Sequence, residues 1–531
     1  MADLKRPLST SSTPEATDND ALDPSVAGLT SQDAADMARL GKAQQFHRNF
    51  SYWATFGFVS IYMATWEFTI VSMSPAIPAV GFGGFFWTFM GCMVCYGAVV
   101  ASLAEMSSMS PTAGGQYHWV SEFAPPRYQK EMSYASGWMS SLGWIASLAG
   151  GTYACADLVQ VAVNIVWTEF VMTAWQLFLI ILAMLLITIV LNTMGAKSLP
   201  ALEVASLVGH TVGFVLFVGV LWGMCRPLNS GREVFLGFEN NSGWANYGAA
   251  CLVTQVSIIW SMLGSDTIVH ISEEVRDASI IVPQAMWWSY VLNSFMAFVM
   301  LITVLFCIGP LESILDADLP YLNLFSNTGS GRAALFLAII MILLVYAGNV
   351  TALATTSREV WAFARDKGFP FSTWIAHMHR KYDMPFNAVY LSTIISIILS
   401  LISLGSSLAF NIILSLSLLA LMSTYSLSIG CVLLRRIQGP ELPHARWSLG
   451  RWGLPINLLA VVYSAFIVLM SCFPSEASPA PADANWAPAI WVAVILLSLV
   501  AYLCHGRKHF TPPVMFIEGK RAAGVGVQKV A

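Results

Sequence analysis

The feature that most restricts the fold of this chain is the recurrence of long apolar segments. A helix needs about 20 mostly apolar residues to cross roughly 30 Å of hydrocarbon. Twelve windows of this kind occur in the 531 residues, most clearly at 85–103, 175–191 and 336–354. With 56% hydrophobic and 11% charged residues, the chain is too apolar for an ordinary soluble domain. The sequence therefore predicts an all-α integral membrane protein with twelve transmembrane helices.

The positive charges predict how these helices are oriented. If both ends of a twelve-span chain lie on one side of the membrane, 23 of its 26 Lys and Arg residues fall on that side. The other side holds Arg226, Arg232 and Arg332, together with a glycosylation sequon that starts at Asn240. Lys and Arg in short loops are retained in the cytoplasm. We therefore expect a multi-pass protein with both termini cytoplasmic, and we assign it to the plasma membrane.

The two ends of the chain lack apolar segments. Residues 1–47 are polar and contain too few large apolar residues to form a core, so we expect a disordered cytoplasmic tail. This stretch also lacks the apolar region of a signal peptide, which leaves targeting to the first span. Residues 505–531 form a second predicted cytoplasmic tail, and 48–504 form the transmembrane domain.

Two of the apolar segments are interrupted by polar residues. The run at 250–262 meets Leu-Gly-Ser-Asp at 263–266, and the segment 52–80 contains Thr-Trp-Glu at 65–67. A broken membrane helix is tolerated only where its freed backbone is buried in protein or lines a cavity. Both interruptions are therefore candidate parts of one binding site.

The spacing of the interruptions predicts an internal repeat. Five spans fall in 48–225 and five in 245–434, and the first span of each unit is interrupted. Because five is odd, the second unit must be inverted in the membrane relative to the first. We expect this 5+5 inverted repeat, with discontinuous helices 1 and 6, to hold substrate near the bilayer midplane. Helices 11 and 12, at about 452–504, follow as a pair.

The predicted substrate site consists of residues at both interruptions. Unwound backbone offers N–H and C=O groups to a carboxylate or an ammonium, and Trp66 and Trp260 offer aromatic faces to a cation. Packing at the lipid interface is the alternative for the Trp residues, and capping of the second half-helix is the alternative for Asp266. The full predicted set is Thr65, Trp66, Glu67, Trp260, Ser261, Leu263, Gly264, Ser265 and Asp266.

Titratable residues inside the spans are candidates for proton coupling. A mid-span carboxylate costs roughly 3 kcal/mol on insertion scales, so Glu67 is expected to face a pathway, and His210 titrates near neutral pH. The alternatives are a neutral Glu67 held by hydrogen bonds and a His210 satisfied by a helix carbonyl. Asp157 and Asn349 are expected either to line a vestibule or site, or to join helices by hydrogen bonds.

Opposite charges on the predicted cytoplasmic side form a candidate inner gate. We expect ion pairs that lock the gate in one state, as at other bistable interfaces. The alternative is a solvated charged rim. The residues concerned are Glu273, Glu274, Arg276, Arg358, Arg365 and Asp366.

Three cytoplasmic motifs carry a family resemblance. They are PTAGGQY at 111–117, EEVRDA at 273–278 followed by Pro283, and SREVWAFARDKGFP at 357–370. On these motifs the chain resembles the fungal-type amino acid/choline transporters of the amino acid-polyamine-organocation superfamily. The resemblance implies uptake of an amino acid, 4-aminobutyrate, choline or a polyamine, coupled to protons. Gln284 departs from the basic residue often found after the proline, which places a cationic inner-gate contact there in doubt.

Other classes of function receive little support from the sequence. It contains no phosphate loop, metal-ligand helix motif or nucleophile elbow, so we expect neither an enzyme nor a bound metal or cofactor. The expected partners are a small-molecule substrate, protons and the lipid bilayer, and not nucleic acid. The alternative function is a transporter-like nutrient sensor that binds the same ligand without net flux.

Overall fold

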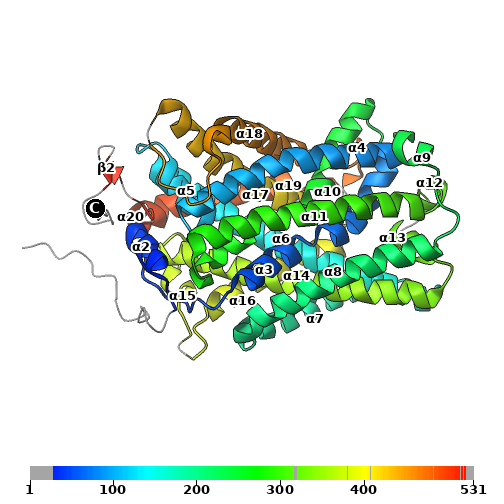
Figure 1. Ribbon diagram of the computed structural model, residues 1–531, viewed down its shortest axis with the longest axis horizontal. Helices are drawn as coiled ribbons and strands as arrows, with labels where there is room; N and C mark the ends of the chain where they lie inside the picture. The colour runs from blue at the N-terminus through cyan, green and yellow to red at the C-terminus, as the bar shows by residue number, and fades with distance from the viewer. Residues whose placement is uncertain are drawn as a thin grey trace, which may run out of the picture.

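The computed structural model describes residues 28–315, 320–379, 381–406, 408–439, 441–481 and 484–514, together with the backbone of two short strands. Its helices run mostly along the long axis of one bundle (Figure 1). The strands, β1 (Phe516–Ile517) and β2 (Lys520–Arg521), pair antiparallel with Phe516 opposite Arg521. The described chain is therefore almost entirely helical, as predicted.

The first half of the chain contains two long, unusually shaped helical segments, α4 and α6. Its helices are, in order, α2 (Ser31–Leu40), α3 (Tyr52–Met63), α4 (Thr65–Met109), α5 (Gly115–Phe123), α6 (Gln129–Val166), α7 (Ala174–Thr193), η2 (Ala196–Ser198), α8 (Leu199–Met224) and α9 (Gly231–Leu236).

The second half begins with a short helix and a 3₁₀ segment in place of one long helix. Its elements are α10 (Tyr247–Trp260), η3 (Thr267–Glu274), α11 (Ala278–Cys307), α12 (Leu311–Leu315), α13 (Pro320–Ser326), α14 (Gly331–Arg365), α15 (Ser372–Ile375), α16 (Phe386–Ser400), η4 (Leu401–Leu404), α17 (Ala409–Gln438), η5 (Gly450–Trp452), α18 (Gly453–Met470), α19 (Ala487–Ala501), η7 (Tyr502–Gly506) and α20 (Arg507–His509).

Length and composition identify nine segments of the described chain that could cross a membrane. The first, Tyr52–Met109, joins the first two predicted spans, because α4 continues through a single non-helical residue, Gly81, at φ 71°. Two predicted spans lie outside this set: α6 is a continuous helix but contains many Gly and Ser residues, which make it less apolar, and α10 has only 14 residues. The protein is thus a multi-pass helical membrane protein by these criteria.

The two ends of the bundle differ in the elements that they carry. We call them the α2 end, with α2, α5, α15 and α20, and the α9 end, with α9, α12 and α13 (Figure 1). The interior is formed mainly by α4, α6, α10, α11, α14 and α17, whereas α7, α8 and α19 expose many Leu, Ile and Val side chains. Such exposed apolar side chains are expected where a helix faces lipid.

The predicted tails differ in part from the structure. Residues 1–27 and 522–531 lie outside the described residues, but 28–47 include α2, and Met37, Leu40 and Phe46 are buried. The prediction of disorder up to residue 47 is therefore wrong for this stretch. Its order comes from an ion pair within the segment, between Arg48 and Asp33 at 3.0 Å, and from contacts with a distant loop, where the N–H of Asp277 donates to Asp33 at 3.0 Å. At the other end, Val514 is buried and its N–H donates to Ser121 Oγ at 2.8 Å.

A close helix crossing provides the first test of this packing. A Cβ added at Gly57 in α3 would lie 2.6 Å from the backbone oxygen of Glu203 in α8. We expect Gly57→Val to lower the free energy of unfolding by about 1–3 kcal/mol. The clash is with the backbone of α8, which cannot move aside by a change of rotamer as a side chain can. Thermal unfolding of the detergent-purified protein measures the loss.

Gly219→Val is the matched control for this substitution. Gly219 is also helical, but a Cβ there would have no atom within 4 Å. An equal fall in unfolding temperature for both variants would show that valine in the helix, rather than the crossing, causes the loss.

Candidate functional site

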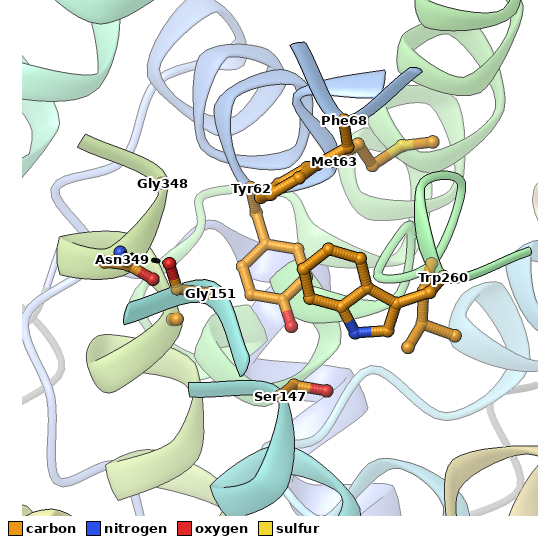
Figure 2. Close-up of a pocket in the computed structure, with 10 residues that line it drawn as sticks. Tyr62, Met63, Phe68, Ser147, Gly151, Trp260, Gly348 and Asn349 are labelled. Atoms are coloured by element: carbon orange, nitrogen blue, oxygen red, sulfur yellow. Dashed lines mark hydrogen bonds between the residues drawn. The ribbon is translucent and has the colours of Figure 1, made fainter. Parts of the chain in front are cut away.

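The two interruptions meet at a small cavity in the middle of the bundle. It has a volume of about 30 Å³, enough for one or two water molecules. Figure 2 shows the rings of Tyr62 and Trp260 pointing into it, with Ser147 of α6 beneath them. The lining residues come from α3, α4, α6, α14 and the end of α10, and are Tyr62, Met63, Phe68, Ser147, Gly151, Trp260, Leu263, Gly348, Asn349 and Ala352.

The first interruption is the junction of α3 and α4. Ala64 has left-handed backbone angles, φ 40° and ψ 43°, which end α3 and start α4 in a new direction. The freed N–H of Thr65 donates to Asn293 Oδ1 in α11 at 3.1 Å. The Asn293 side chain thus accepts the hydrogen bond for which the broken helix has no acceptor. The hydrocarbon of a bilayer could not accept it.

The second interruption fits against the first. Gly264 has φ 97°, a conformation that glycine adopts readily and other residues rarely do. A Cβ at this position would lie 1.9 Å from the ring of Tyr62. The glycine is therefore required both by the backbone turn and by the aromatic ring that fills the adjacent space.

The structure divides the predicted substrate residues into two groups. Trp260 and Leu263 line the cavity, and Gly264 lies against Tyr62. Trp66 and Glu67 instead project from α4 towards α8, while Phe68 turns to the cavity. This follows from helix geometry, in which successive side chains are rotated by about 100°. Thr65 and Ser265 each follow a lining residue, Met63 or Leu263, by two positions, and their buried hydroxyl oxygens have no hydrogen-bond partner in the described structure.

Asp266 bonds to side chains of two other helices. It does not line the cavity, and its side chain makes no N-cap hydrogen bond at the start of η3. Its carboxylate accepts from Gln116 in α5 and from the hydroxyl of Tyr425 in α17, the latter at 2.7 Å. Asp266 therefore anchors the second interruption to two other helices. The hydroxyl of Ser261 also has a partner within the protein, because it donates to the carbonyl of Ile258 at 2.6 Å.

The two proton-coupling candidates lie in direct contact. His210 Nδ1 is 2.6 Å from Glu67 Oε1, and both side chains are fully buried. Trp66 donates its indole N–H to the same ring nitrogen at 3.1 Å. The other polar atoms of the pair, Glu67 Oε2 and His210 Nε2, have no partner in the described structure. The pair can share or exchange a proton at a site separate from the cavity.

Some cavity residues carry only a weak signal in the sequence. Asn349 both lines the cavity and joins two helices, because its Nδ2 donates to the carbonyl of Gly151 at 3.0 Å. Small residues such as Gly151 and Gly348 in apolar helices mark close helix approach. Tyr62 and Phe68 resemble any other aromatic residue of an apolar span, so pattern alone does not identify them.

An aromatic septum separates this cavity from a larger one towards the α9 end. We use this name for Phe68, Trp260, Phe410 and Tyr153, whose consecutive ring centroids lie 4.7, 5.3 and 5.7 Å apart. The larger cavity, which we call the vestibule, has a volume of about 460 Å³. It is lined by residues such as Pro75 of α4 and Tyr153 of α6, as well as by the loop residues around Ser475.

Ion pairs close the α2 end of the bundle. Arg365 donates two hydrogen bonds to Glu273, both at 2.9 Å, and Arg358 donates to Glu274 at 3.0 Å. These four predicted gate residues thus join η3 to α14. Asp366 instead accepts from Tyr117 at 2.9 Å and pairs with Lys42.

The segment before α3, residues 28–50, adds a layer to this closure. Gln44 donates to the carbonyl of Glu273 at 2.7 Å, and Phe46 packs edge-on against Trp361 at 4.8 Å. Burial lowers the pKa of Lys42, and the adjacent Asp366 carboxylate opposes that shift. The sixth predicted gate residue, Arg276, donates to the carbonyl of Arg48 at 2.9 Å.

Comparison with known proteins identifies relatives over nearly the whole chain. A family model described as amino acid permease matches residues 50–497. Amino-acid permease 2 of Neurospora crassa is 26% identical, over 94% of this chain and 93% of its own. The choline transporter of Saccharomyces cerevisiae is 25% identical, over 87% and 82% of the two chains. An uncharacterized amino-acid permease of Schizosaccharomyces pombe is 29% identical, over 93% and 92%.

A solved structure shares the fold at low sequence identity. A manganese transporter variant from Eremococcus coleocola is 12% identical, with a TM-score of 0.50, over 87% of this chain and 95% of its own. This likeness concerns the fold alone. Within the described part of the present chain, no group of three or more His, Cys, Asp or Glu residues is placed to hold a metal ion.

The contact between Gly264 and Tyr62 generates the second test. We expect Gly264→Ala to lower the unfolding temperature of the purified protein markedly, since it adds a steric clash to a left-handed backbone cost of about 1–2 kcal/mol. Gly329→Ala is the matched control, because Gly329 has φ 67° but no atom within 4 Å of an added Cβ. Equal losses for the two variants would contradict the proposed interlocking of the interruptions.

Proposed function

Since the chain belongs to the amino acid permease family, we propose that it is a secondary active transporter for an amino acid or a related amine such as 4-aminobutyrate, choline or a polyamine. Its relatives are named as permeases or transporters, so the chain is a transport protein and not an enzyme. The choice among these substrates is left to direct competition for uptake.

The observation that carries this proposal is the cavity between two interrupted helices. At about 30 Å³ it is far smaller than an amino acid, so substrate can enter only if the surrounding helices move apart. Ion pairs close one end, whereas only the aromatic septum separates the cavity from the vestibule at the other. We infer transport by alternating access, in which the two ends open in turn.

The proposed architecture is twelve crossings in two inverted units. Residues 48–225 would form the first unit and 245–434 the second, with 452–504 as the final pair. In support, each unit starts with an interrupted helix, α3 with α4 and α10 with η3, and the two interruptions touch. From the distribution of positive residues we propose that the α2 end and both termini are cytoplasmic. The proposed location is the plasma membrane.

Substrate contacts are proposed for the residues that line the cavity or lie beside it. The aromatic faces of Trp260 and Phe68 suit an ammonium group. The backbone at 263–265 and the unpartnered hydroxyls of Thr65 and Ser265 can bind the other polar groups of the substrate. The cavity has no charged side chain in its lining, so a charged substrate would rely on these neutral groups.

Uptake by a transport-deficient host tests the proposed function. Labelled choline, 4-aminobutyrate, a polyamine and several α-amino acids are compared, with a pH gradient imposed or collapsed. We expect accumulation of at least one solute. A nutrient sensor would bind a labelled solute without accumulating it, and that result would overturn the proposal.

The pair of Glu67 and His210 is the proposed site of proton coupling. A gradient of about one pH unit can drive about tenfold accumulation per coupled proton, because each unit corresponds to about 1.4 kcal/mol. We expect Glu67→Gln to abolish this gradient-driven accumulation while equilibration of the solute persists. The measurement is labelled uptake at two external pH values, normalised to the protein at the cell surface.

Glu203→Gln is the matched control for this test. Glu203 is also a buried carboxyl in the membrane domain, with one oxygen bonded by Thr351 at 2.9 Å. We expect its neutral variant to retain coupling. Loss of coupling in Glu203→Gln, but not in Glu67→Gln, would move the proton site to Glu203.

The ion pair of Glu273 and Arg365 is the proposed inner gate. Removing one partner of a buried pair leaves an uncompensated charge, which costs about 3–5 kcal/mol. We therefore expect Arg365→Glu to reduce uptake to below about a tenth, and the added change Glu273→Arg to restore part of it. Arg446→Glu at the half-exposed pair with Asp277 should have little effect, because exposed pairs contribute about 0–1 kcal/mol. Failure of the double reversal to restore any uptake would contradict a gate based on this pair.

A further inference from the structure

The described lining of the vestibule contains acidic residues and no basic ones. Of the residues that line it, Asp157 and Glu476 are ionisable as acids, and none is Lys, Arg or His. Glu476 is exposed at the rim, whereas Asp157 lies deeper, largely buried on α6. A cleft with charge of one sign and apolar walls concentrates counter-ions and speeds their entry. The vestibule should therefore attract cations and repel carboxylates.

Asp157 has no partner within the described protein. No hydrogen bond or ion pair joins it to another described residue, although a largely buried carboxylate is costly unless it is paired. Helix-to-helix hydrogen bonding, one of the two roles expected for Asp157, is therefore not present in this structure. Its carboxylate is available to a ligand in the vestibule.

Aromatic rings lie next to this carboxylate. Tyr153 is one helical turn before Asp157 on α6, so the two side chains share a face of the helix. The ring of Tyr153 stacks on Phe410 with centroids 5.7 Å apart, and Tyr321 also lines the vestibule. A carboxylate beside aromatic faces suits an ammonium group, which pairs with the charge and packs its methylene or methyl groups on the rings.

We propose that the vestibule is a second substrate-binding site, selective for small organic cations, in which Asp157 pairs with the ammonium group above the aromatic septum. The inference rests on the proposed transport function. It assigns charge selection to the vestibule, since the cavity beyond the septum has no charged side chain in its lining. An amine without a carboxylate would bind there, whereas a zwitterion would gain little.

The test compares a cationic and a zwitterionic probe in the full-length protein. Labelled choline is the cation and labelled 4-aminobutyrate the zwitterion, each measured by uptake in a transport-deficient host. We expect Asp157→Asn to raise the KM for choline about tenfold and to change the KM for 4-aminobutyrate less than about twofold. Asp157→Glu should restore the choline KM, because it keeps the charge.

Two controls separate a local effect from a general one. Glu169→Gln removes one negative charge from an exposed residue that does not line the vestibule, and it should leave both KM values unchanged. Raising the ionic strength from about 0.01 M to about 1 M shortens the Debye length from about 30 to 3 Å. This change should weaken choline uptake by the unaltered protein more than uptake by Asp157→Asn.

Several results would overturn the proposal. They are equal changes in both KM values, an altered pH dependence without a difference between the probes, or an effect of Glu169→Gln as large as that of Asp157→Asn. If the host accumulates neither probe nor any of the other labelled solutes, the proposed transport function fails. Saturable binding of labelled choline to the purified full-length protein, lost in Asp157→Asn, would still support the vestibule site, and an absence of such binding would overturn it.

Discussion

The constraint on which the rest of this structure depends is the hydrogen bonding of backbone groups inside the membrane. Helices satisfy these groups internally, so an interruption must find other partners or be shielded by protein. At the first interruption Asn293 accepts from the freed N–H of Thr65. At the second, the N–H of Thr267 donates to the carbonyl of Gly264, and the Asp266 side chain joins this segment to Gln116 and Tyr425. The packing of α5, α11 and α17 around the interruptions is what allows a cavity to exist there.

Much of the fold follows from residue patterns. Apolar windows predict the helical bundle, and Gly264 among polar neighbours predicts an interruption, because glycine adopts φ 97° at little cost. The direction of side chains after an interruption is harder to predict. Ala64 has a left-handed backbone that no sequence signal marks, and this residue sets the rotation of all that follow. Glu67 consequently points to His210, whereas Phe68, the next residue of the helix, points to the cavity.

Composition was also a poor guide to the segment before α3. It contains few large apolar residues, which favours disorder, but its order depends on partners more than 200 residues away. Asp33 accepts from the backbone N–H groups of Asp277 and Ala278 at the start of α11, and it also pairs with Arg48. A rule that counts apolar residues locally cannot include such partners. The vestibule poses the same difficulty, because Asp157 gains its surroundings only when α6 packs against distant loops.

A short backbone pairing between the segment before α3 and the end of η3 restricts how these two elements can move. Phe50 N–H donates to the carbonyl of Glu274 at 3.1 Å, and the carbonyl of Phe50 accepts from Arg276, so the chain entering α3 and the chain leaving η3 form one bridge. This bridge holds the start of α3 and the end of η3 together, so that these two ends move as one body. Their attachment to α14 includes the pairs of Glu273 with Arg365 and of Glu274 with Arg358, which can separate without unfolding any backbone. In the proposed transport cycle, the α2 end would open by movement of α3 and η3 together away from α14, rather than by separation of α3 from η3.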